Sequence, residues 1–190
     1  MTRVLGKALE ERGQSLTDLD ATDLATPEIN VALANRSLDA AMQIEPLLTL
    51  GAASGLFTQA LRSDELYPDQ QAGFALYAAD FARNQVEAGR RWMIGYLRGA
   101  RAYNDAFLRD QNFDDVVESL VRYTAVKDRA LYRQMATTYA APDGRMNVAA
   151  VVEDQDWYAD RGYVPQKVDI NALIDYQFVD YALSVLPAVP

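Results

Sequence analysis

The chain has 190 residues, of which 50% are hydrophobic and 24% are charged, so it can bury a core and is not a disordered chain. Its net charge of −9 argues against a nucleic-acid surface, which needs a basic stripe, and against binding to an anionic membrane face. The absence of cysteine and histidine excludes disulfides, Ser-His-Asp and Cys-His catalysis, and the usual zinc sites. Any enzymatic reaction would have to use carboxylates, lysine or tyrosine.

The first 80 residues alternate between helical patterns and short apolar runs. One helix is predicted to start at Thr26-Pro27-Glu28, which supplies a hydroxyl N-cap, a proline in the first turn and an acid beside it. The helical patterns cover residues 3–12, 26–35 and 46–53. The apolar runs, which are typical of buried strands, cover residues 21–24, 40–44, 56–61 and 73–78. This alternation predicts an α/β fold with a short, mostly parallel sheet and flanking helices.

After residue 80 the patterns are helical. The longest helix, predicted for residues 86–108, has apolar side chains at spacings of three and four that form one continuous stripe. Further helices are predicted for residues 114–124 and 128–139, from the cap Asn147 to about residue 158, and after the cap Asp169. The second part of the chain is therefore predicted to be all-helical.

Several short stretches occur in a defined order and spacing along nearly the whole chain. They are VALANRSLDAA at residues 31–41, Glu45-Pro46, ADFARN at 79–84 with Glu87-Ala88, LRGARAYN at 97–104, Asp156-Trp157-Tyr158, and Leu173-Ile174-Asp175 with Phe178-Val179. Together they resemble the C-terminal part of the solute-binding proteins of ABC importers of the nitrate/sulfonate/taurine type. That group also includes thiamine-pyrimidine binding proteins.

The resemblance implies a domain layout and a location. Residues 1–80 would be part of the second lobe of a periplasmic-binding-protein type 2 fold, with a hinge strand near 73–78. Residues 81–190 would be a helical segment that packs on a first lobe missing from this chain. We therefore expect a fragment of a longer protein, whose parent would be periplasmic although this chain has no signal peptide.

Four polar residues are candidates for ligand binding. Glu45 follows the predicted strand 40–44, and open α/β sheets bind ligands beyond the carboxyl ends of their strands. The alternative is that its carboxylate stabilises the start of the next helix, an effect of about 0.3–1 kcal/mol. Gln43 could face the same ligand or bond the backbone, Asp39 could contact the ligand or only form a turn, and Tyr77 could line the cleft or pack in the core.

The resemblance implies a binding protein without catalytic residues, metal or cofactor. It would bind a small molecule such as a sulfonate, nitrate or a pyrimidine-like compound, and the parent protein would deliver it to the permease of an ABC importer. A first alternative is a helical scaffold without ligand, which self-associates into a homodimer through exposed helix faces. A second alternative, synthesis of the thiamine pyrimidine, is disfavoured because relatives with that activity use a histidine as reactant and this chain has none.

Overall fold

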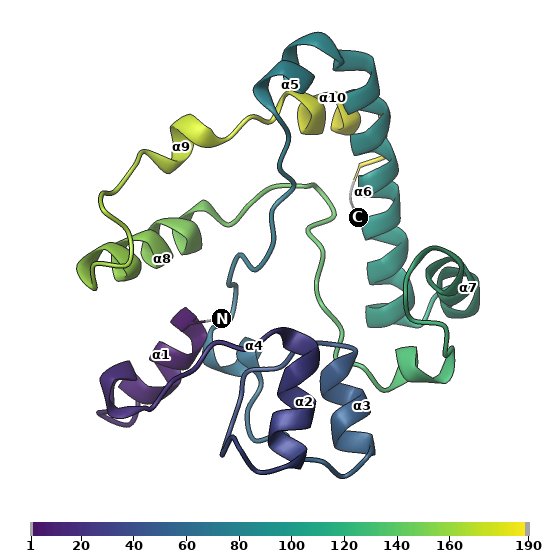
Figure 1. Cartoon of the computed structure of the whole chain (residues 1–190). Helices are drawn as coiled ribbons and strands as arrows, with labels where there is room; N and C mark the ends of the chain where they lie inside the picture. The colour runs from purple at the N-terminus through teal and green to yellow at the C-terminus, as the bar shows by residue number, and fades with distance from the viewer. Residues whose placement is uncertain (1, 189–190) are drawn as a thin grey trace. The chain divides into compact units, whose positions relative to one another are not determined.

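The computed structural model describes residues 2–188, and these form helices joined by irregular segments (Figure 1). The chain divides into two compact units, each built from two stretches of sequence. Unit one comprises residues 1–70 and 124–136, and unit two comprises residues 71–123 and 137–190.

Unit one is built from short helices. They are α1 (Thr2–Glu10), α2 (Thr26–Ala34), α3 (Leu47–Ala53) and α4 (Ser63–Leu66), with 3₁₀ turns η1 (Leu16–Asp18) and η2 (Ala130–Arg133). Helix α1 contacts α4, and α2 packs beside α3. Tyr67 anchors the first of these contacts because it is buried and Lys7 Nζ lies 4.1 Å from its ring centroid.

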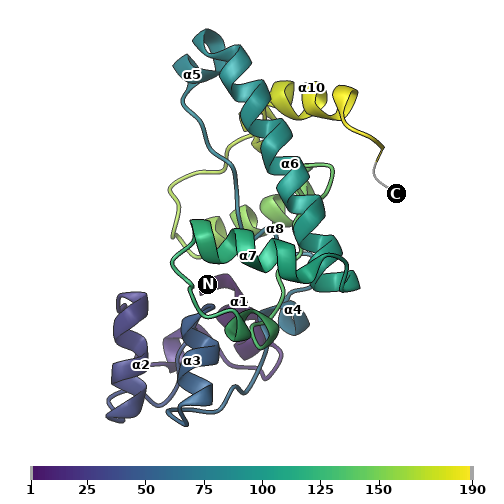
Figure 2. The ribbon, with the colours of Figure 1, turned by 90° about the vertical axis from the view of Figure 1, so that its right-hand side faces the viewer.

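Unit two is organised around one long helix, α6 (Val86–Arg109), which packs most extensively against α10 (Gln177–Val185). Helices α5 (Ala79–Asn84) and α7 (Phe113–Tyr123) also contact α6, and Figure 2 shows α7 crossing its C-terminal part. The remaining helices are α8 (Val148–Asp160) and α9 (Ile170–Leu173). The predicted stripe of α6 is confirmed on its buried side, because Leu97 is fully buried and Met93 nearly so, in one cluster with Phe178 and Ala182.

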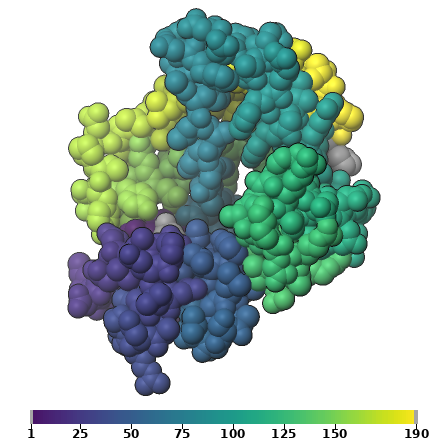
Figure 3. Space-filling model, turned by 45° about the vertical axis from the view of Figure 1, so that its right-hand side comes forward, coloured from purple at the N-terminus to yellow at the C-terminus, as the bar shows by residue number. Residues whose placement is uncertain are grey.

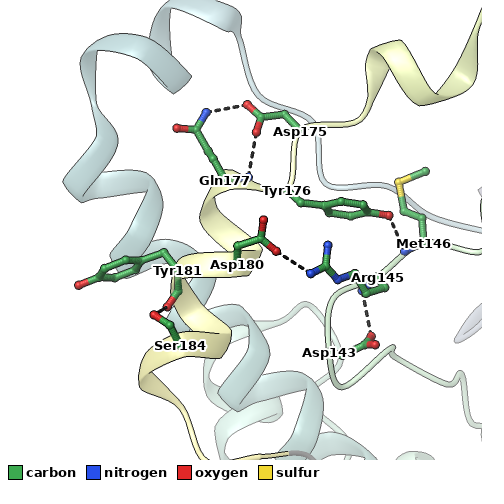
Figure 4. Close-up of polar contacts among 9 residues, drawn as sticks. All are labelled: Asp143, Arg145, Met146, Asp175, Tyr176, Gln177, Asp180, Tyr181 and Ser184. Atoms are coloured by element: carbon green, nitrogen blue, oxygen red, sulfur yellow. Dashed lines mark hydrogen bonds and ion pairs between the residues drawn. The ribbon is translucent and has the colours of Figure 1, made fainter.

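Polar contacts fix the loop before α8 to α10 (Figure 4). Arg145 Nη2 lies 2.5 Å from Asp180 Oδ1, and its guanidinium lies 4.3 Å from the ring centroid of Tyr176. The hydroxyl of Tyr176 accepts a hydrogen bond from the backbone N–H of Met146 at 3.3 Å. These contacts bring residues 143–146 beside a helix that starts more than 30 positions later.

The predicted α/β fold is wrong, because the described residues contain no β-strand. The four runs predicted as strands are irregular segments. Several of their large apolar side chains stay in solvent: Ile44 is 50% exposed, Leu61 47% and Leu76 91%. A strand is stable only where neighbouring strands accept and donate its backbone hydrogen bonds, and no such neighbours assemble among residues 2–188.

Candidate functional site

The structure places Glu45 immediately before α3, where it bonds to the protein itself. Its carboxylate accepts hydrogen bonds from Thr49 N at 3.2 Å and Thr49 Oγ1 at 2.9 Å, in the first turn of the helix. Its Oε1 also accepts a hydrogen bond at 3.0 Å from the backbone N–H of Ala136, just after η2. The carboxylate therefore joins two distant stretches of unit one, and these bonds agree with the alternative in which Glu45 stabilises the start of a helix.

We expect Glu45→Ala to lower the free energy of unfolding of unit one by about 1–3 kcal/mol, because two half-buried N–H groups lose a charged acceptor. Hydrogen exchange at the Ala136 amide should be faster in the Glu45→Ala variant, because this amide loses its acceptor. Glu28→Ala is the control, because Glu28 is an acid in the first turn of the neighbouring helix α2 but is exposed. If both substitutions lower the free energy of unfolding in urea equally, the hydrogen bond between Glu45 and Ala136 does not contribute to stability.

The other predicted residues also lie within ordinary structural contacts. Gln43 Nε2 donates to Asn30 Oδ1 at 2.7 Å and to the carbonyl of Thr26 at 3.2 Å, so it ties its segment to α2. Asp39 is exposed in a bend of unit one. These two and Glu45 belong to unit one, and none of the three lines the hollow in unit two that is described below.

Tyr77 belongs to the core of unit two. Its ring centroid lies 5.2 Å from that of Phe178, and its hydroxyl donates to the carbonyl of Asp175 at 2.8 Å. Burial and the neighbouring negative charge of Asp175 raise the pKa of the Tyr77 phenol. Packing, the second of the two roles considered for it, accounts for these contacts.

A hollow of about 770 Å³ lies in unit two beside the C-terminal half of α6. That volume is within the range of small-molecule sites. Its wall comes from three stretches of sequence: residues 98–116, which run from α6 into α7, residues 139–142, and residues 185–188. The polar lining is Arg98, Arg101, Asn104, Asp105, Arg109, Gln111 and Asn112, and the apolar lining includes Leu108, Val116, Tyr139 and Leu186.

Two side chains of α6 hold this wall in place. Asn104 is buried and forms two hydrogen bonds with the backbone of Ala140. Its Nδ2 donates to the Ala140 carbonyl at 2.6 Å, and its Oδ1 accepts from the Ala140 N–H at 3.2 Å. Arg101 donates from Nε to the carbonyl of Pro142 at 2.9 Å and from Nη1 to that of Pro187 at 2.8 Å. The hollow therefore has a rim fixed by side-chain bonds to the backbone.

The charge of the hollow is opposite to that of the chain. Three guanidinium groups, those of Arg98, Arg101 and Arg109, line it with a single carboxylate, Asp105. That carboxylate pairs with Arg109 at 2.8 Å. Arg98 is exposed, and neither it nor Arg101 forms an ion pair within residues 2–188. The Nη2 of Arg101 is buried and has no acceptor among the described residues, so its positive charge is poorly compensated.

The sequence prediction missed this hollow because it treated α6 only as an apolar stripe. A signal was present: the helix carries five arginines and two acids in a chain of net charge −9. No group of three metal-binding side chains occurs within the described residues. In the same range, every helix is too short or too polar to span a bilayer.

Comparison with family models, with curated proteins and with solved structures gave no match to this chain. The resemblance of its short stretches to importer solute-binding proteins therefore stays a prediction. The main structural indication of function is the arginine-lined hollow beside α6.

Proposed function

We propose that the chain is a non-catalytic binding protein for a small organic or inorganic anion, and that the anion sits in the hollow beside α6. The observation that carries this proposal is the local excess of guanidinium groups at a ligand-sized hollow in an acidic chain. Arginine suits oxyanions because its planar fork of N–H donors matches carboxylate, sulfonate and phosphate groups. The positive charge of the half-buried Arg101 also favours an anion in the hollow, since its Nη2 has no acceptor among the described residues.

The prediction of an importer role fits this site chemistry, since sulfonates and nitrate are anions. In this proposal the chain belongs to the solute-binding component of an ABC importer, acting outside the cytoplasmic membrane and handing its solute to a permease. The proposal rests on the hollow in unit two, because the α/β lobe on which the predicted cleft depended is absent from the described residues.

The test is a binding screen by thermal shift and calorimetry with alkanesulfonates, nitrate, phosphate and small carboxylates, beside an uncharged pyrimidine. An anion present at about 100 times its Kd stabilises the protein by about 2.7 kcal/mol. Arg98→Ala should weaken that anion about tenfold or more, because an exposed charged donor is lost from the hollow. Added salt should weaken it further, since part of the attraction is screened.

Arg83→Ala is the matched control, because Arg83 is an exposed arginine of α5 that does not line the hollow. It should leave the affinity unchanged. The proposal is wrong if no anion of the panel shifts the melting temperature, or if Arg98→Ala and Arg83→Ala weaken binding equally.

A further inference from the structure

The apolar stripe of α6 has two sides: α10 covers Met93 and Leu97, whereas the side with Trp92, Tyr96, Tyr103 and Phe107 is covered along only half of its length. Near the C-terminal end of α6, the rings of Tyr103 and Phe107 stack with their centroids 4.4 Å apart. The ring of Phe107 packs edge-on against that of Phe113 in α7, with a centroid distance of 5.1 Å. Ala106 of α6 and Val117 of α7 are both buried, and the two helices contact each other. Helix α7 therefore covers this half of the stripe.

The N-terminal half of the same stripe faces solvent. Trp92 is 51% exposed and Tyr96 is 44% exposed, and their rings stack at 5.4 Å with an interplanar angle of 10°. Gly95 and Gly99 lie beside them, and a Cβ at either position would meet no atom within 4 Å. In Figure 3 this teal part of α6 is visible at the surface, above the green residues of α7. We call Trp92, Gly95, Tyr96 and Gly99 the open face.

The open face combines anchors with room for close approach. Two aromatic rings provide large apolar area at a small entropic cost, which is typical of interface hot spots. The two glycines, four residues apart, leave a shallow groove into which the side chains of a second helix could insert.

Charge indicates what covers the open face. Arg91 and Arg98 are exposed and flank it on one side of the helix. The helix that already covers the other half, α7, is itself acidic and amphipathic: Asp114, Asp115 and Glu118 are exposed, whereas Val117 is buried. The same stripe therefore already binds one acidic helix.

We propose that the open face binds an acidic amphipathic helix of a partner protein, which lies along α6 as a continuation of α7. A second copy of this chain fits less well, because pairing α6 with α6 would bring two arginine-rich helices together. Arg98 flanks the open face and also lines the hollow, whereas Trp92, Gly95, Tyr96 and Gly99 do not line the hollow, so substitutions at these four residues test this proposal separately from anion binding.

The experiment uses the full chain and a labelled peptide that repeats residues 113–123 twice. The 11-residue repeat keeps the acidic and apolar residues on constant faces of the helix. Fluorescence anisotropy should show saturable binding, and a peptide with lysine in place of each Asp and Glu should bind at least tenfold more weakly. Acrylamide quenching should fall on binding, because Trp92 is exposed whereas Trp157 is buried.

Gly99→Leu should weaken the acidic peptide at least tenfold by filling the groove. Its folding should be retained, since leucine is a better helix former than glycine and the site is open. Gly73→Leu, at an open glycine outside α6, is the control and should bind as the original chain does. The proposal is overturned if the acidic peptide does not bind at about 1 mM, if both peptides bind equally, or if Gly99→Leu has no effect. It is also overturned if sedimentation shows a dimer that Gly99→Leu dissociates, because a second copy would then cover the face.

Discussion

Phe178→Ala is expected to lower the free energy of unfolding of unit two by about 3–5 kcal/mol. Phe178 is 1% exposed and lies in the cluster where α10 packs on α6. The centroid of its ring lies 5.2 Å from that of Tyr77 and 6.2 Å from that of Phe81. Removing the ring therefore leaves a cavity bordered by several elements. Since native domains are stable by about 5–15 kcal/mol, this single substitution should bring unit two close to unfolding.

Urea unfolding followed by circular dichroism measures this loss. Phe74→Ala is the control, because the same substitution is made at a side chain that is 52% exposed in the same unit. It should change stability by no more than about 0.5 kcal/mol. Equal effects of the two substitutions would show that the α6–α10 contact does not form the core of unit two.

Gly89→Val is expected to destabilise unit two by about 1–3 kcal/mol through overpacking. Gly89 is buried in the first turns of α6, and a Cβ at this position would lie 2.3 Å from the ring of Phe178. That ring is enclosed by the same cluster and has little room to move. Helix α10 must therefore shift away from α6 to accommodate the new side chain.

Gly95→Val is the control for Gly89→Val, because it makes the same change of helix propensity in the same helix at a site without close neighbours. A Cβ at residue 95 meets nothing within 4 Å, so the substitution should leave stability unchanged or raise it by a few tenths of a kcal/mol. Thermal melts of the two variants make the comparison. A loss at residue 95 as large as that at residue 89 would contradict the close contact between α6 and α10.

Those parts of the fold that depend on neighbouring residues could be predicted from the sequence. Helix α6 was expected at residues 86–108 and spans Val86–Arg109. Asn147 and Asp169 cap helices as predicted, each accepting a hydrogen bond from a backbone N–H of the first turn. The helix predicted for residues 128–139 is only the 3₁₀ turn η2, and the last predicted helix is divided into α9 and α10.

The errors concern contacts between distant residues. A run of four to six apolar residues does not reveal whether partner strands exist, so residues 40–44 and 73–78 were misassigned. The position of Glu45 at a helix start was predictable, but its bond to Ala136 was not, since 91 positions separate them. The hollow was hidden for the same reason: Arg98, Pro142 and Leu186 become neighbours only when unit two folds.

The division of each unit into two stretches of sequence affects how the chain can fold as it is synthesised. The chain passes between the units three times, after residues 70, 123 and 136. Residues 1–70 leave the ribosome well before the segment 124–136 that completes unit one, and at about 5–20 residues per second the N–H of Ala136 follows Glu45 by about 5–20 s. During that interval the Glu45 carboxylate has only Thr49 to bond within unit one, and the nascent unit is exposed to chaperones and proteases in an unfinished form.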